Sequence, residues 1–117
     1  IMASAKNAVI AGDYEKCAIG AAAPKNIFIL KGLKQIKLNH DMVESYEVMN
    51  SETSKSAASA VGRGLVGNFL LGPIGMAAAL SAKNKGIYVV AIQFKDGKKS
   101  LIELDDKKYK VLMAALF

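Results

Sequence analysis

The strongest structural signal in the chain is the stretch 87–104, which reads IYVVAIQFKDGKKSLIEL. Apolar and β-branched residues fill both sides of Lys95-Asp96-Gly97, and this combination is typical of a β-hairpin. The sequence therefore predicts two antiparallel strands, 87–94 and 98–104, joined by a tight turn.

Two registers of this hairpin compete. A two-residue Asp-Gly turn would pair Phe94 with Lys99, whereas a three-residue loop with Gly97 in a left-handed bulge pairs Phe94 with Lys98. A slip of one residue exchanges the two faces of a strand. The three-residue loop collects nearly all the large apolar side chains on one face, and we therefore expect it.

The second face of the hairpin is also partly apolar, because it carries Val89, Ala91 and Leu101. This pattern indicates that something covers the second face or that the sheet curls.

Residues 105–117 predict a C-terminal helix that packs over the end or the open side of the sheet. Asp105 stands at the N-cap position, and Asp106 adds a carboxylate to the first turn. One helical face then carries the apolar side chains of Tyr109, Leu112, Met113 and Leu116.

Residues 13–50 predict a first group of strands, at 14–19, 27–30, 33–38 and 42–49. Turn signals separate these runs at Pro24, Gly32 and Asn39-His40-Asp41. The Ala-rich stretch 3–11 favours a short helix, which Gly12 and Asp13 would end.

The 117 residues predict a single domain, 1–117, because a chain of this length forms one modest core. The elements above predict an α+β fold, with a curled antiparallel sheet, a hairpin at 86–104, a C-terminal helix and a Gly/Ala-rich insert at 51–85.

The insert contains 19 consecutive residues without a charge, from 64 to 82. That length is enough for a membrane span, but Gly72-Pro73 breaks a helix in its middle. Two short helical arms, near 55–71 and 74–83, fit the pattern better. The alternatives are a compact connection packed on its own sheet, shallow membrane insertion, and self-association through small residues spaced four apart.

The apolar residues of the insert are the candidate contacts with a membrane or a partner protein. They are Val66, Phe69, Leu70, Leu71, Ile74 and Met76. Arg63, Lys83 and Lys85 flank them and are the candidate contacts with anionic headgroups, each worth ~1 kcal/mol near such a surface.

Catalytic, metal and nucleotide chemistry find little support in the sequence. His40 stands in a turn, where we expect it to be solvated, and Cys17 is expected to be a small buried residue. One His and one Cys cannot build a metal cage. The spelling Gly62-x-Gly64-x-x-Gly67 lacks the strand–turn–helix context of a dinucleotide site. We expect neither an enzyme nor a cofactor, and a single unpaired Cys favours the cytoplasm.

A net charge of +6 favours anionic partners in general. Lys31, Lys34 and Lys37 would serve a nucleic-acid surface, yet the chain has one Arg, Arg63, and few aromatic residues. A nucleic-acid partner is therefore the least favoured of the three classes.

The order of strands, insert, hairpin 87–104 and C-terminal helix 105–117 resembles the bacterial pleckstrin-homology-like domains. The stretch Leu70-Leu71-Gly72-Pro73-Ile74-Gly75 is similar to glycine-rich segments of small uncharacterised proteins from Gram-positive bacteria. Both resemblances imply a binding module. We therefore expect a non-enzymatic module, peripheral to a membrane surface through the insert. The alternative is a protein-interaction or self-assembly module that forms homo-oligomers.

Overall fold

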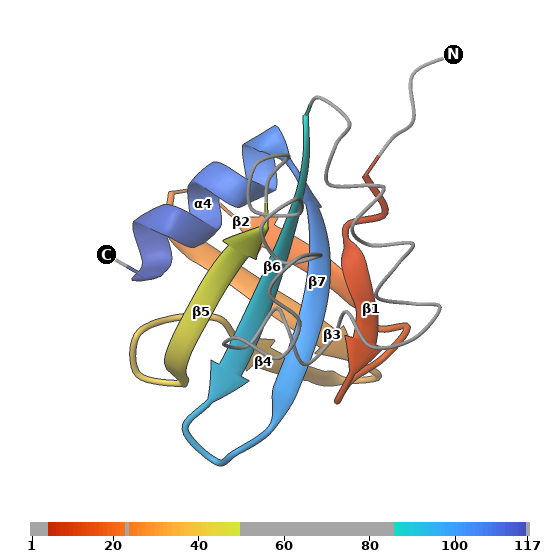
Figure 1. The fold of residues 1–117 in the computed structure, drawn as a ribbon, viewed down its shortest axis with the longest axis vertical. Helices are drawn as coiled ribbons and strands as arrows, with labels where there is room; N and C mark the ends of the chain where they lie inside the picture. Colours follow the sequence, from red (N-terminus) through yellow and green to blue (C-terminus); the bar gives the residue numbers. More distant parts are fainter. Residues whose placement is uncertain (1–4, 23, 50–85, 117) are drawn as a thin grey trace, which may run out of the picture.

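The computed structural model describes residues 5–22, 24–49 and 86–116, and it has an α+β architecture. Seven strands in these ranges form one antiparallel sheet with the spatial order β4-β3-β2-β1-β7-β6-β5. In Figure 1, β5, β6, β7 and β1 form the near layer and β2, β3 and β4 lie behind it, so the sheet curls over on itself. The elements are β1 (Ala8–Gly12), β2 (Ala18–Ala22), β3 (Asn26–Lys31), β4 (Lys34–Lys37), β5 (Val43–Met49), β6 (Ile87–Phe94), β7 (Lys99–Asp105) and α4 (Asp106–Leu116).

The hairpin of β6 and β7 adopts the predicted three-residue loop. The N–H of Phe94 donates to the carbonyl of Lys98 at 2.7 Å, and Val90 pairs with Ile102. Gly97 has a φ of 93°, a left-handed conformation that glycine adopts without a steric cost. The expected register is therefore confirmed.

The hydrophobic core lies between the two layers of the curled sheet. Burial of these apolar side chains is the main stabilising term of the fold. Every strand except β4 supplies buried apolar side chains to the core, and α4 adds two. They are Val9, Ile19, Ile27, Ile29, Val43, Val90, Ile92, Phe94, Ile102, Leu104, Leu112 and Ala115, and Leu38, just after β4, joins them.

The C-terminal helix is confirmed, and it covers the upper end of the sheet in Figure 1. Asp105 caps the helix, because its Oδ1 accepts the backbone N–H of Lys108 at 2.8 Å. The ring of Tyr109 stacks on the ring of Tyr88 in β6, with 4.0 Å between centroids. Leu112 is fully buried in the core, as its place on the apolar face predicts.

The predicted helix over 3–11 is wrong in the described part of that stretch, because Ala8–Gly12 forms β1. β1 lies between β2 and β7, so its backbone N–H and C=O groups are satisfied by neighbouring strands. Tertiary pairing here overrides the helix propensity of alanine. The first group of strands therefore begins before residue 13.

The predicted strand at 14–19 is also displaced. Residues 13–16 form a turn in which Tyr14 and Lys16 have positive φ values, of 65° and 72°. β2 begins only at Ala18 and extends to Ala22. Non-glycine residues seldom adopt such φ values, which explains why pattern alone placed a strand here.

The remaining predicted strands and turns agree with the structure. β3, β4 and β5 lie within two residues of the expected ranges. Gly32 turns the chain between β3 and β4 with a φ of 61°. Asn39 Oδ1 accepts the N–H groups of Asp41 and Met42 at 3.1 Å, which is the expected side-chain turn.

Candidate functional site

Three turns of the sheet meet around Tyr14, at the end of the sheet opposite α4 (Figure 1). Tyr14 lies in the β1–β2 turn, and its ring packs edge-on against Phe94, with 5.6 Å between centroids and 84° between planes. Phe94 ends β6, so this contact joins the β1–β2 turn to the β6–β7 turn. We call this end of the molecule the basic end, because it carries Lys16, Lys31, Lys34 and Lys98.

Two lysines approach the ring of Tyr14 from different turns. The Nζ of Lys31, from the end of β3, lies 5.4 Å from the ring centroid, and that of Lys98 lies 5.6 Å away. Both distances are within the range of cation–π attraction. Tyr14 and, secondarily, the Asp96 carboxylate raise the pKa of Lys98. Lys98 is therefore a cation at neutral pH, and the exposed Lys16 and Lys34 add charge at the same end.

Hydrogen bonds fix the β1–β2 turn against β7. The N–H of Asp13 donates to the Lys99 carbonyl at 2.8 Å, and the N–H of Lys99 donates to Asp13 Oδ2 at 2.9 Å. The Ser100 hydroxyl donates to the Asp13 carbonyl at 2.6 Å. These bonds tie the β1–β2 turn to β7, a central strand of the sheet, and so hold Tyr14's turn in place.

An apolar side chain projects from this basic end. Leu33 lies in the β3–β4 turn, and the residue is fully exposed. It follows Gly32 and lies between Lys31 and Lys34, and Leu30 nearby is 37% exposed. Sequence reasoning selected Lys31 and Lys34 of this region, for a nucleic-acid surface, and missed Lys16, Lys98 and Leu33. The available signal was a large apolar residue at a turn position, where a polar residue is usual.

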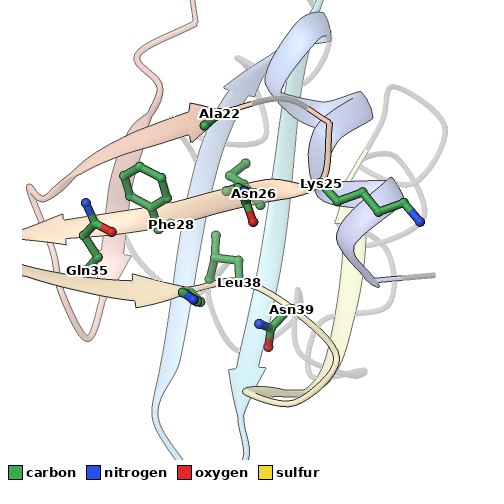
Figure 2. A pocket seen from close by; sticks show the side chains of 9 residues that line it. Ala22, Lys25, Asn26, Phe28, Gln35, Leu38 and Asn39 are labelled. Carbon is green, nitrogen blue, oxygen red and sulfur yellow. The ribbon is translucent and has the colours of Figure 1, made fainter.

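A shallow hollow of about 230 Å³ lies over β3 and β4, near the β2–β3 turn (Figure 2). Phe28 lies across Gly20, where an added Cβ would come within 2.8 Å of the Phe28 ring. Its lining offers amide side chains and an aromatic ring, while the side chain of Lys25 extends away from it in Figure 2, so the hollow suits hydrogen bonding to a polar group. It is lined by Ala22, Lys25, Asn26, Ile27, Phe28, Gln35, Lys37, Leu38 and Asn39.

His40 and Cys17 are the two residues that the sequence analysis considered for polar or metal chemistry. His40 is 72% exposed in its side chain and lies 3.4 Å from Asp41, which agrees with the expected solvated turn. Cys17 is a free thiol, half-buried rather than buried. Across residues 5–22, 24–49 and 86–116, no cluster of three or more His, Cys, Asp or Glu side chains is placed to hold a metal ion.

The insert residues predicted as contacts lie outside the described residues. This applies to Val66, Phe69, Leu70, Leu71, Ile74, Met76, Arg63, Lys83 and Lys85. In the part of the chain that is described, no helix has the length and apolar character needed to cross a membrane.

No protein-family model, no curated protein and no solved structure matches this chain.

Proposed function

We propose that the chain is a non-enzymatic binding module that associates with an anionic membrane surface. The observation that carries this proposal is the fully exposed Leu33, held at the tip of a turn between Lys31 and Lys34. An apolar side chain flanked by cations is the combination that inserts into an anionic lipid interface. The proposed location is the cytoplasm, peripheral to the membrane.

The fold supports a binding role. Seven antiparallel strands form a curled sheet and a C-terminal helix closes one end of it, and this arrangement supports a pleckstrin-homology-like fold. We propose that the chain has this type of fold, and that the basic end, opposite the helix, faces the membrane.

The energies favour reversible binding. Moving Leu33 from water into lipid is worth about 1.5–3 kcal/mol. Each lysine close to an anionic surface adds ~1 kcal/mol, and Lys16, Lys31 and Lys34 lie at this end with Lys98. A single weak anchor of this size is marginal, and stable association needs a second signal.

We propose the uncharged stretch 64–82 of the insert as that second contact. Its apolar residues, including Phe69 and Leu71, would enter the interface, and Arg63 and Lys83 would meet headgroups. This stretch lies outside the described residues, so the two contacts are tested separately.

The first test measures co-sedimentation with phosphatidylserine-containing vesicles and with neutral phosphatidylcholine vesicles. Leu33→Asp is expected to weaken binding to the anionic vesicles about tenfold or more, because it removes the apolar contact and adds a negative charge. The control is Ala22→Asp, which adds the same negative charge at an exposed position. Ala22 ends β2, and the start of β2 is the end that borders the β1–β2 turn of the basic end. Equal binding of Leu33→Asp and the unmodified chain would contradict the proposal.

The second contact is tested with the double variant Phe69→Asp, Leu71→Asp. Loss of vesicle binding is expected if the insert enters the lipid. Unchanged binding by this variant, together with loss in Leu33→Asp, would assign the contact to the β3–β4 turn alone.

A protein-interaction module is the second candidate, because β4 is an edge strand. Among the described residues β4 pairs only with β3, which leaves one side of its backbone available for a partner strand. Lys34 and Lys37 on this strand favour an acidic partner. Light scattering that shows a concentration-dependent oligomer, without vesicle binding, would favour this candidate. Steeply salt-dependent binding of an oligonucleotide would instead favour the nucleic-acid class.

A further inference from the structure

The part of the sheet formed by β2, β3 and β4 carries an aromatic residue on the side away from the core. Ile27 and Ile29 of β3 are buried in the core, and alternation along the strand turns Phe28 to the opposite side. There Phe28 pairs with Gly20 of β2 and with Lys37 of β4. Phe28 is half-buried, so part of its ring is open to solvent.

Gly20 allows the Phe28 ring to lie flat across β2. A Cβ at Gly20 would come within 2.8 Å of the ring, so any larger residue would force the ring to move. Figure 2 looks into the hollow over β3 and β4 and shows the ring nearly face-on. The aromatic face is therefore presented to the open side of the hollow.

Amide side chains surround this ring. In Figure 2, Gln35 lies on one side of the ring and Asn26 on the other. Both residues are exposed, and neither side chain forms a hydrogen bond with another described residue. Asn39 also lines the hollow, and its Oδ1 already accepts the N–H groups of Asp41 and Met42, which leaves its NH2 group as a donor.

Strand pairing holds the backbone beneath these side chains. The N–H of Leu38 donates to the carbonyl of Ile27 at 2.9 Å, which extends the pairing of β3 with β4 beyond Lys37. Leu38 and Ile27 also line the hollow, and both are buried in the core. The aromatic ring and the amide groups are therefore supported by strands that are hydrogen-bonded to each other.

We propose that this hollow binds one neutral hexopyranose ring of a carbohydrate. The face of an aromatic ring carries partial negative charge, so it attracts the C–H groups on the apolar face of a sugar ring. A side-chain amide offers a donor and an acceptor side by side, which matches two neighbouring hydroxyl groups. A pyranose ring presents both kinds of surface together.

Charge and size favour this class of ligand. Lys25 extends away from the hollow in Figure 2, which leaves Lys37 as the one ammonium group among the described lining residues that can face a ligand. Three neutral amides and one cation suit a neutral ligand better than a polyanion. The volume of about 230 Å³ is below the roughly 300–1,000 Å³ of sites for drug-sized ligands, so we expect a single ring.

The hollow is separate from the proposed membrane contact. It borders the β2–β3 turn, whereas Leu33 lies in the β3–β4 turn at the other end of β3. Failure of the vesicle tests therefore leaves carbohydrate binding intact, and failure of the tests below leaves the contact at Leu33 intact.

The direct test is an NMR titration of the full chain, labelled with ¹⁵N. The probes are the methyl glycosides of glucose, galactose and mannose, and N-acetylglucosamine. At least one probe is expected to shift the backbone amide signals of residues 26–28 and 35–39 in a saturable manner. The expected Kd is about 1–10 mM, because the site is small and shallow. No shift of these signals by any probe, at concentrations about tenfold above that range, would overturn the proposal.

Substitutions in the hollow test which groups bind the sugar. Phe28→Ala should raise the Kd about fivefold or more, because it removes the stacking surface. Gln35→Ala should raise it about two- to tenfold, because it removes a hydrogen-bonding amide from an exposed position. Gln93→Ala removes an amide on β6, outside the hollow, and is the matched control.

Gln35→Ala keeps the test decisive if Phe28→Ala fails to fold, which circular dichroism would show. Equal Kd values for Gln35→Ala, Gln93→Ala and the unmodified chain would refute the assignment of the sugar to this hollow.

A titration with a thymidine oligonucleotide distinguishes a second kind of ligand, because nucleobases also stack on aromatic side chains. The oligonucleotide is expected to leave the signals of residues 26–28 and 35–39 unchanged at about 0.15 M salt. Shifts of these signals by the oligonucleotide and by none of the sugars, with a steep dependence on salt, would overturn the proposal in favour of single-stranded nucleic acid.

Discussion

The carboxylate of Asp106 joins the first turn of α4 both to its own helix and to the sheet. Its Oδ2 lies 3.1 Å from Lys110 Nζ, and its Oδ1 accepts the Tyr88 hydroxyl at 3.1 Å. The Lys110 contact, followed by the Tyr88 hydrogen bond, lowers the pKa of Asp106. The same hydrogen bond is the main reason why the pKa of Tyr88 is raised. A single exposed residue thus links helix and strand.

We predict that Tyr88→Phe raises the pKa of Asp106 towards its ordinary value of 3.8, because the donor is removed while Lys110 remains. Since the folded-state pKa of Asp106 is lowered, its carboxylate stabilises the fold above its ordinary pKa. That contribution is lost as pH falls through the folded-state pKa. An NMR titration of the side-chain carboxyl carbons measures the shift.

Tyr109→Phe is the matched control for this prediction. It retains an aromatic ring against Tyr88 and keeps the Tyr88 hydroxyl available to Asp106. An unchanged Asp106 titration in Tyr88→Phe would show that the hydroxyl does not act on the carboxylate.

Helix α4 illustrates how one element completes the core. Leu112 is fully buried and Ala115 nearly so, and both join core residues of the sheet. The exposed lysines 107 and 110 lie on the solvent side. The helix therefore covers one end of the curled sheet. The turns and lysines of the basic end lie at the opposite end.

Leu112→Ala is expected to lower the free energy of unfolding by about 2–5 kcal/mol, because it removes a buried side chain and leaves a cavity. That is a large part of the about 5–15 kcal/mol typical of a domain. Urea unfolding followed by circular dichroism gives the value. The control Lys107→Ala, on the exposed side of α4, should change the free energy by less than about 0.5 kcal/mol. Similar values for the two variants would contradict a core role for the helix.

The molecule as a whole carries a net charge of +6. In the described part, the lysines at the turns around Tyr14 place some of this charge at one end, next to the exposed Leu33. Exposed charges attract an anionic surface only within a screening length, which falls from roughly 10 Å at 0.1 M salt to roughly 3 Å at 1 M.

Binding to anionic vesicles should therefore fall steeply when salt is raised from about 0.1 M to about 1 M. Co-sedimentation at both salt concentrations measures the effect, and circular dichroism confirms that the chain remains folded. Any residual binding to neutral vesicles should change little, because it depends on apolar contact. Binding to anionic vesicles that is insensitive to salt would exclude an electrostatic role for the lysines.

Local patterns were sufficient for the hairpin register, the C-terminal helix and the turns at Gly32 and Asn39. Each of these features depends on residues that are close together in the chain. The turns need a glycine in the left-handed conformation or an Asn side chain, and the helix needs an N-cap residue and apolar side chains at helical spacing. The α+β class follows from these elements together. The contacts proposed in the insert stay predictions, since they lie outside the described residues.

Long-range pairing decided the rest. Ala8–Gly12 is a strand because it pairs with β2 on one side and with β7 on the other. Its alanine-rich sequence does not indicate this pairing. The ring of Tyr14 contacts Lys31, Lys98 and Phe94, which are far from it in the sequence. No spacing along the chain indicates that these residues lie close to Tyr14. The physical reason is that pattern reports local propensity, whereas the position of a strand in a curled sheet depends on hydrogen bonds and packing between residues far apart in the sequence.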